Sequence, residues 1–125
     1  MENVARILVG LIAAFMLVSG LGFWFHTDTM NKIFALSTLN DLGFASIRAD
    51  FASFFLAIGL FAGIAAWKRD PHFAASAATL FILALIGRVI SLGFEGQVAG
   101  GVPPMLIEAI SAGILLWARQ IWQNS

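Results

Sequence analysis

The sequence contains no cysteine in its 125 residues. The chain therefore cannot form a disulfide, a thiolate metal site, an iron–sulfur cluster or a cysteine nucleophile, because each of these needs a thiol. A redox role would need a cofactor carried by a partner. The absence of cysteine thus excludes a large group of metal and redox proteins.

Charge is also scarce, with 11% charged residues, and seven basic residues balance seven acidic ones. A chain of zero net charge offers no electrostatic footprint for nucleic acid, so we expect no such partner. Hydrophobic residues make up 60% of the sequence, against roughly 45–50% in soluble domains. This composition predicts an integral membrane protein that contacts the lipid bilayer.

Four stretches approach the ~20 apolar residues that a helix needs to cross a bilayer. They cover residues 4–25, 43–67, 73–94 and 103–122. The first run is longer than the ~7–15 apolar residues of a signal peptide, so we expect it to remain as a span. The sequence thus predicts an all-α bundle of four transmembrane helices in a single domain, residues 1–125.

The connection between the first two spans is long enough to hold structure of its own. Met30, Ile33 and Phe34 recur at helical spacing after Thr27 and Asp28, which are favourable helix-capping residues. We therefore expect a short helix there, lying in the membrane interface.

Positive charges predict the orientation of the chain. Arg6, Lys68, Arg69 and Arg119 lie on the side shared by both termini, whereas the opposite connections offer only Lys32. Cytoplasmic loops carry the excess of Lys and Arg, so both termini are expected in the cytoplasm.

Near one face of the bilayer, five ionisable residues lie in the expected spans or at their ends: Arg48, Asp50, Arg88, Glu95 and Glu108. An unpaired charge at the centre of a transmembrane helix costs roughly 2.5–3.5 kcal/mol. At the helical rise, four of the five lie about 6–10 Å inside helix ends on the same side of the bilayer. We therefore expect one polar cluster in the outer leaflet.

Helical spacing predicts how this cluster is assembled. Ser91 and Glu95 share a face with Arg88, and Ser111 shares one with Glu108, so we expect these two faces to meet. Asp50 is expected to face Arg88, whereas Arg48 is expected to reach the interface or pair with Asp41 or Glu95.

The two histidines are expected at opposite membrane surfaces, where they cannot share an ion. We therefore predict no metal site. His26 lies on the side of the polar cluster, so it is a candidate accessory member together with Ser91 and Ser111. Because imidazole titrates near neutral pH, His26 would make the cluster respond to pH.

Three interpretations of the cluster remain open. It is a structural ion-pair network, an outward-facing pocket for a lipid, quinone or other small amphiphile, or part of a proton or ion pathway. The inner half of each span carries no ionisable residue between the cluster and the cytoplasmic ends. A continuous relay across the membrane is therefore missing.

Several short motifs resemble a family of small bacterial four-helix inner-membrane proteins, a domain-of-unknown-function family similar to the DoxX-like group. They are Ile47-Arg48-Ala49-Asp50, Gly87-Arg88-Val89-Ile90-Ser91-Leu92 followed by Gly96, and Glu108 early in the last span. The resemblance implies the same fold and a bacterial inner membrane. It also implies an association with membrane redox or quinone systems.

We therefore predict a non-enzymatic binding or accessory protein, with no catalytic residue and no resident cofactor. The alternatives are a small transporter or proton-coupled carrier using the buried carboxylates, and a structural subunit of a membrane complex. A membrane enzyme would need these carboxylates as general acid and base. Small residues spaced four apart in the spans also allow a homo-oligomer or another membrane partner.

Overall fold

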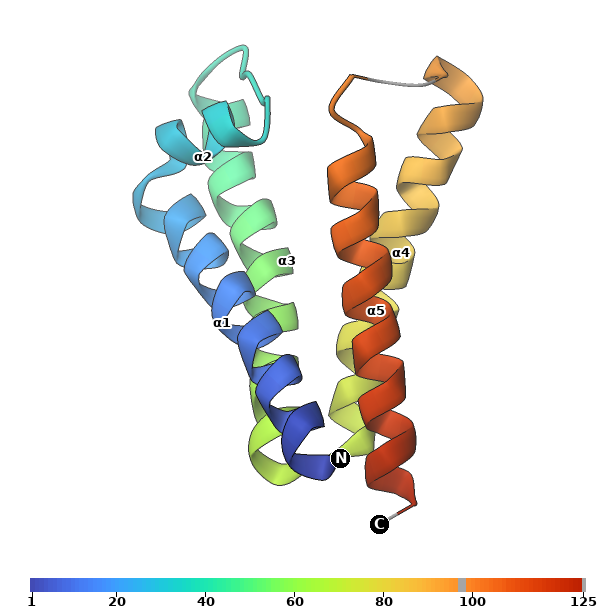
Figure 1. Ribbon diagram of the computed structural model, residues 1–125. Helices are drawn as coiled ribbons and strands as arrows, with labels where there is room; N and C mark the ends of the chain where they lie inside the picture. Colours follow the sequence, from blue (N-terminus) through green and yellow to red (C-terminus); the bar gives the residue numbers. More distant parts are fainter. Residues whose placement is uncertain (97–98, 125) are drawn as a thin grey trace.

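The chain forms four long helices and one short one (Figure 1). The computed structural model describes residues 1–96 and 99–124, so Gln97, Val98 and Ser125 of the expected domain lie outside the described residues. The helices are α1 (Glu2–Phe25), α2 (Thr27–Ile33), α3 (Asp41–Lys68), α4 (Pro71–Glu95) and α5 (Val102–Gln123), and these residues include no strand. The predicted all-α fold is confirmed, including the short helix in the first connection.

The four long helices are long and apolar enough to cross a membrane. Each contains one of the expected spans. Their outward surfaces carry large apolar side chains, such as Phe15, Val18 and Ile110, which are more than half exposed. Such surfaces are stable against lipid tails and not against water. The protein is therefore a multi-pass membrane protein.

Local sequence explains where the helices begin and end. The side chain of Asn40 accepts a hydrogen bond from the backbone N–H of Gly43 at the start of α3, and Asp70 caps α4 in the same way. Pro71 follows directly, in the first turn of α4, where a missing N–H is harmless. Arg69 ends α3 in the left-handed conformation, with φ at 50°. These residues end α3 and begin α4 within a short turn.

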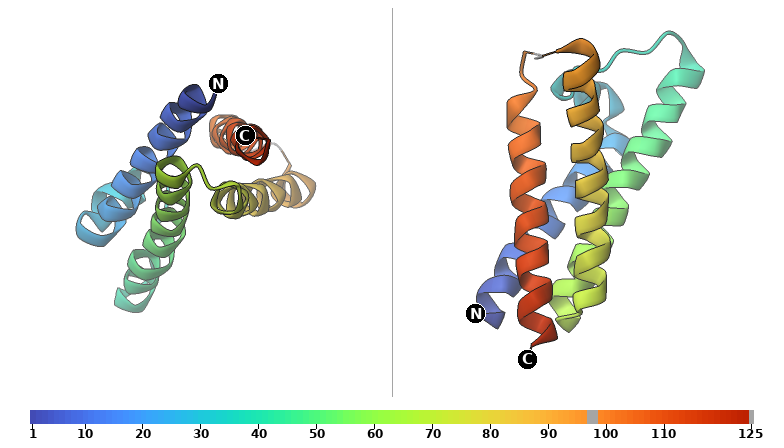
Figure 2. Two further views of the ribbon diagram at one scale, coloured as in Figure 1. Left: turned by 90° about the horizontal axis from the view of Figure 1, so that it is seen from below. Right: turned by 90° about the vertical axis from the view of Figure 1, so that its right-hand side faces the viewer.

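The long helices form two pairs, α1 with α3 and α4 with α5 (Figures 1 and 2). The pairs meet at the end of the molecule that carries both chain termini, here called the terminal end, and diverge toward the opposite end, here called the α2 end. Between α1 and α3 the backbones approach closely at Gly20 and Gly59. A Cβ at either position would lie under 3 Å from a leucine of the other helix.

The main core lies in the terminal half of the molecule. Its fully buried members come from all four long helices, for example Val9, Ile58, Ala77 and Leu115. Many core members are alanines, which let the helices pack closely. At the α2 end Phe23 of α1 and Phe51 and Phe55 of α3 form an aromatic cluster with Phe34, which directly follows α2. The two pairs thus share a core at one end and separate at the other.

Candidate functional site

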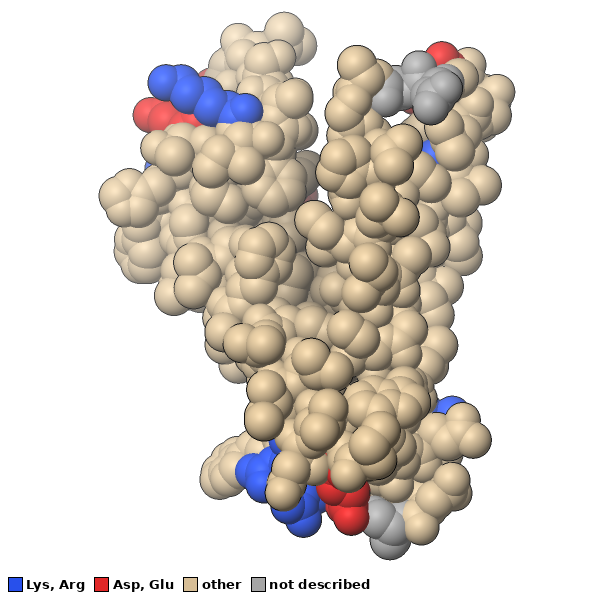
Figure 3. Space-filling view, viewed as in Figure 1, with Lys and Arg blue, Asp and Glu red and all other residues tan. Residues whose placement is uncertain are grey.

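A cavity of about 1100 Å³ lies at the α2 end, against α4, α5 and the turn after α2. Its lining residues come from these three elements: Ala35, Leu36, Leu85, Arg88, Ser91, Leu92, Glu95, Gly96, Gly101, Val102, Met105, Leu106 and Ala109. Figure 3 shows the surface notched between the two helix pairs at this end. Ligand cavities typically measure about 300–1,000 Å³, so this partly open space is large enough for a small molecule or a lipid headgroup.

An ion pair between α4 and α5 supports the polar part of the cavity. The Nε–H of Arg88 donates to both carboxylate oxygens of Glu108, at 2.8 and 2.9 Å. The Glu108 side chain is 11% exposed and that of Arg88 is 41% exposed. The carboxylate is thus buried behind the guanidinium, and the guanidinium faces the cavity.

The remaining donors of Arg88 have no partner among the described residues. Among the described residues, its Nη1 and Nη2 groups form no hydrogen bond. An arginine carries five N–H donors in a planar fork. Four of these donors are therefore available to a group in the cavity that accepts hydrogen bonds.

Ser91 and Glu95 join Arg88 in the cavity lining. Other serines in the helices, such as Ser53 and Ser76, donate to the carbonyl four residues earlier. Within the part of the chain that the structure describes, no such bond holds the Ser91 hydroxyl, and Glu95 forms no ion pair. Both side chains can therefore interact with a bound molecule.

The rest of the cavity wall is apolar. Leu85 and Leu92 lie on either side of Arg88 along α4, and Met105 and Leu106 face them from α5. Sequence reasoning missed these four residues, although Leu85 and Leu92 lie three and four residues from Arg88 and so share its face. No feature of the sequence around Ala35 and Leu36 predicted that these two residues line the cavity. The cavity thus combines a polar group with apolar walls.

The two members of the expected cluster that lie on α3, Arg48 and Asp50, are outside this cavity. Arg48 donates from Nε to the Thr27 hydroxyl at 3.2 Å, and its guanidinium lies 5.1 Å from the centre of the Phe44 ring. Thr27 is 2% exposed, so this contact ties α3 to α2. The expected pairing of Arg48 with Asp41 or Glu95 is absent from the described residues.

Asp50 is exposed and forms no ion pair with any described residue. The expected contact between Asp50 and Arg88 is therefore wrong, since Arg88 pairs with Glu108. The physical reason is the divergence of the helix pairs toward the α2 end (Figure 1). Of the five expected members of the cluster, Arg88 and Glu95 line the cavity and Glu108 pairs with Arg88. Arg48 and Asp50 lie apart from the cavity.

The two remaining candidate residues, Ser111 and His26, do not line the cavity. Ser111 is 8% exposed, one turn from Glu108 on α5, and does not line the cavity. His26 is exposed between α1 and α2 and is also absent from the lining. Among residues 1–96 and 99–124, no group of three or more His, Asp or Glu side chains is placed to hold a metal ion.

The arrangement can hold a molecule by hydrogen bonds to Arg88 and Ser91 and by apolar contact along α4 and α5. The side chains that line the cavity can bind a ligand. Among the described residues, the hydrogen-bond partner of the Glu108 carboxylate is Arg88. The resemblance to the DoxX-like group remains a prediction. Comparisons with protein-family models, with characterised proteins and with solved structures find no match for this chain.

Proposed function

We propose that this protein is a non-enzymatic membrane binding or accessory protein that holds a small amphiphile, such as a lipid or a quinone, in the cavity at the α2 end. The supporting observation is the half-exposed guanidinium of Arg88, which is fixed by buried Glu108 and faces a cavity with apolar walls. The polar end of the ligand lies at Arg88 and Ser91. Its apolar part lies along the leucine and methionine side chains.

The membrane location belongs to the same proposal. We place the protein in a bacterial inner membrane, with both termini in the cytoplasm and the cavity on the outer side. The basic residues Arg6, Lys68, Arg69 and Arg119 support this orientation, because they occur near the turns and ends that share the terminal end. The cavity is then reached from the outer leaflet or from the outer aqueous phase.

Glu108 matters to binding because it orients Arg88. An arginine side chain has about 2 kcal/mol of rotamer entropy, which a flexible cation would lose on binding. The two Nε contacts to Glu108 fix the guanidinium before any ligand arrives. The ion pair also keeps the pair as a whole neutral. The site therefore selects a ligand whose polar end accepts hydrogen bonds, and the negative charge of a ligand alone is not enough for binding.

The ligand chemistry follows from these groups. The free N–H groups of Arg88 suit carbonyl, ether or phosphate oxygens. The Glu95 carboxylate lines the same cavity and favours a ligand with a donor or a positive group near its polar end. A quinone head supplies two carbonyl oxygens that accept hydrogen bonds from Arg88. A zwitterionic lipid headgroup supplies phosphate oxygens for Arg88 and also a positive group for Glu95.

The test compares the wild type with the double variant Arg88→Met, Glu108→Leu. Removing both charges together leaves no buried carboxylate without a partner, and such apolar replacements of buried ion pairs are often neutral for stability. We expect the double variant to insert and fold but to lose the ligand. Mass spectrometry of molecules extracted from the purified proteins, followed by titration with a short-tailed benzoquinone and a short-chain phosphatidylethanolamine, measures this loss.

The conservative variant Arg88→Lys separates a binding role from a structural one. Lysine keeps the charge beside Glu108 but lacks the planar fork, so we expect normal folding and at least tenfold weaker binding, which corresponds to about 1.4 kcal/mol. Equal retention of the same molecules by the wild type, Arg88→Lys and the folded double variant would contradict the proposal. That result would leave the ion pair with a structural role.

A further inference from the structure

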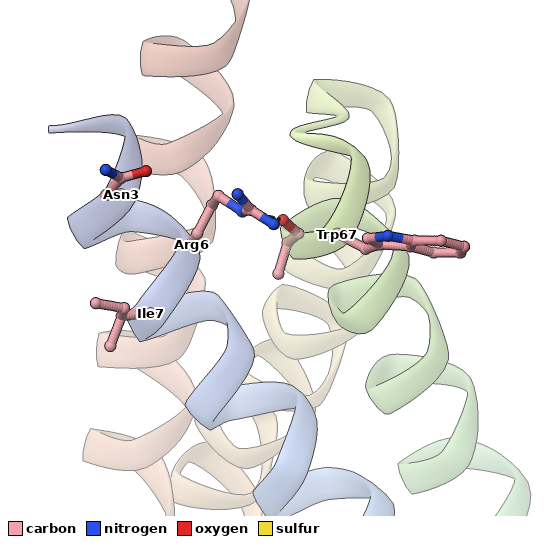
Figure 4. A pocket seen from close by; sticks show the side chains of 5 residues that line it. Asn3, Arg6, Ile7 and Trp67 are labelled. Carbon is pink, nitrogen blue, oxygen red and sulfur yellow. Dashed lines mark hydrogen bonds between the residues drawn. The ribbon is translucent and has the colours of Figure 1, made fainter.

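A second cavity, which is shallow and largely open to its surroundings, has a volume of about 640 Å³ and lies at the terminal end between α1 and α3. It is lined by Asn3, Arg6, Ile7, Ala66 and Trp67. Figure 4 shows Arg6 extending from α1 toward α3, with Asn3 and Ile7 to either side of it along α1 and the Trp67 ring projecting from α3. This cavity lies at the opposite end of the molecule from the one at Arg88.

The backbone of α3 holds Arg6 in place. Its Nε–H donates to the carbonyl oxygen of Ala66 at 2.8 Å. Ala66 lies in the last turn of α3, where carbonyl groups lack a partner within the helix. The contact satisfies this carbonyl and fixes the guanidinium plane. Among the described residues the Nη1 and Nη2 groups of Arg6 form no hydrogen bond, so four N–H donors remain available.

The nearby carboxylates are engaged elsewhere. The Oε1 atom of Glu2 lies 4.0 Å from Nε of Arg69. The Asp70 carboxylate accepts hydrogen bonds from the backbone N–H groups of His72 and Phe73 at the start of α4. Within residues 1–96 and 99–124, no carboxylate lies within ion-pair distance of Arg6. Arg6 is therefore a cation held against α3 that faces the cavity and has no counter-ion among the described residues.

The surroundings of Arg6 combine further positive charge with apolar surface. The Trp67 side chain is 74% exposed, and the ammonium of Lys68 lies 5.9 Å from the centre of its ring. Ile7, beside Arg6, is 63% exposed. Tryptophan favours the level of the lipid headgroups, where one side of the ring meets acyl chains and the other meets water.

We propose that this second cavity binds the phosphate group of an anionic phospholipid. The free N–H groups of Arg6 match the phosphate oxygens, because a guanidinium binds phosphate through parallel hydrogen bonds. Lys68 adds positive charge beside the cavity, and Ile7 and Trp67 contact the glycerol and the first part of the acyl chains. The site is independent of the function proposed for the cavity at Arg88.

A lipid explains the whole site better than free phosphate does. Apolar Ile7 and Trp67 line the same cavity as Arg6 and suit the apolar part of a lipid, which free phosphate lacks. The site also lies at the end of the helices, where a phospholipid headgroup is present at high local concentration. Polybasic segments at this level attract anionic lipids.

The test uses the full chain in detergent, after removal of bound lipid, and adds dioleoylphosphatidylglycerol or dioleoylphosphatidylcholine. Native mass spectrometry counts the lipids that each protein retains. We expect the wild type to prefer the anionic lipid and Arg6→Gln to bind it about fivefold or more weakly, as the loss of one basic residue near a membrane surface predicts. Arg119→Gln is the matched control, because it removes the same charge from α5 without changing the lining of the cavity.

Three results would overturn the proposal. The first is an equal loss of lipid in Arg6→Gln and Arg119→Gln, which would indicate a general effect of charge. The second is a wild type with no preference for phosphatidylglycerol. The third is inorganic phosphate binding as tightly as the lipid, which would make this a soluble-anion site. The thermal unfolding temperature of each variant in detergent verifies that Arg6→Gln remains folded.

Discussion

At the scale of single residues, the ion pair between Arg88 and Glu108 is asymmetric. The carboxylate is buried while the guanidinium is partly open to the cavity. Removing the partner of a buried charge leaves that charge unpaired in a poorly solvated place, which costs more than the pair itself contributes. The two residues are therefore not equivalent in their effect on stability, although they share one contact.

This asymmetry gives a prediction for single substitutions. Arg88→Leu is expected to lower the free energy of unfolding by about 3–5 kcal/mol, because it strands the Glu108 carboxylate. Glu108→Gln keeps a hydrogen-bond acceptor for Arg88 and is expected to cost only about 1 kcal/mol. Denaturant titration in detergent micelles measures both values. Equal losses in the two variants would contradict the burial that the structure assigns to Glu108.

At the scale of helices, the close contact of α1 with α3 depends on two glycines. A Cβ at Gly20 would lie 2.6 Å from the Leu56 side chain, and one at Gly59 would lie 2.7 Å from Leu17 and 3.0 Å from its backbone nitrogen. At Gly63, by contrast, a Cβ would meet only the Ala13 side chain, at 3.9 Å. An added methyl group therefore has too little space at Gly20 and Gly59 and enough space at Gly63.

Alanine substitutions test this difference. Gly20→Ala and Gly59→Ala are expected to destabilise the protein by about 1–3 kcal/mol, because the added methyl group forces the helices apart. Gly63→Ala is the matched control and should gain about 0.5–1 kcal/mol from the better helix propensity of alanine. Unfolding in detergent measures all three. A Gly59→Ala variant as stable as Gly63→Ala would show that α1 and α3 lie farther apart.

At the scale of the whole molecule, the two helix pairs share a core at the terminal end and diverge toward the α2 end (Figure 1). The alanine-rich core lets the helices approach at one end. At the other end an aromatic cluster joins α1, α3 and the residue after α2, and the cavity lies against α4 and α5. The proposed ligand site is a consequence of this uneven packing.

The proposed orientation is tested by single introduced cysteines, since the natural chain has none. Ser37 is exposed in the turn after α2, and Asn124 is exposed at the terminal end. In intact cells a membrane-impermeant maleimide is expected to label Ser37→Cys. It should label Asn124→Cys only after the inner membrane is opened. The reverse pattern would place the cavity at the cytoplasmic face.

Local sequence was sufficient to predict the helices. Long apolar runs predict spans because the backbone must satisfy its own hydrogen bonds in lipid, and capping residues such as Asn40 and Asp70 mark where helices begin. The shared face of Arg88, Ser91 and Glu95 also follows from helical geometry alone. These features depend on neighbours within one helix.

Contacts between helices could not be predicted in the same way. Helical spacing places Asp50 on a face of α3, but it does not say how far that face lies from α4. The same holds for Arg6, whose contact with Ala66 joins residues sixty positions apart.

The sequence by itself therefore determined a membrane protein of four spanning helices and the charges each helix carries, because hydropathy and helical period are local properties. Only the tertiary structure decided that Arg88 pairs with Glu108, that Arg48 and Asp50 lie apart from this pair, and that cavities form beside Arg88 and Arg6. The physical reason is that these outcomes depend on the angles between packed helices, which small residues such as Gly20 and Gly59 set through contacts distant in the chain.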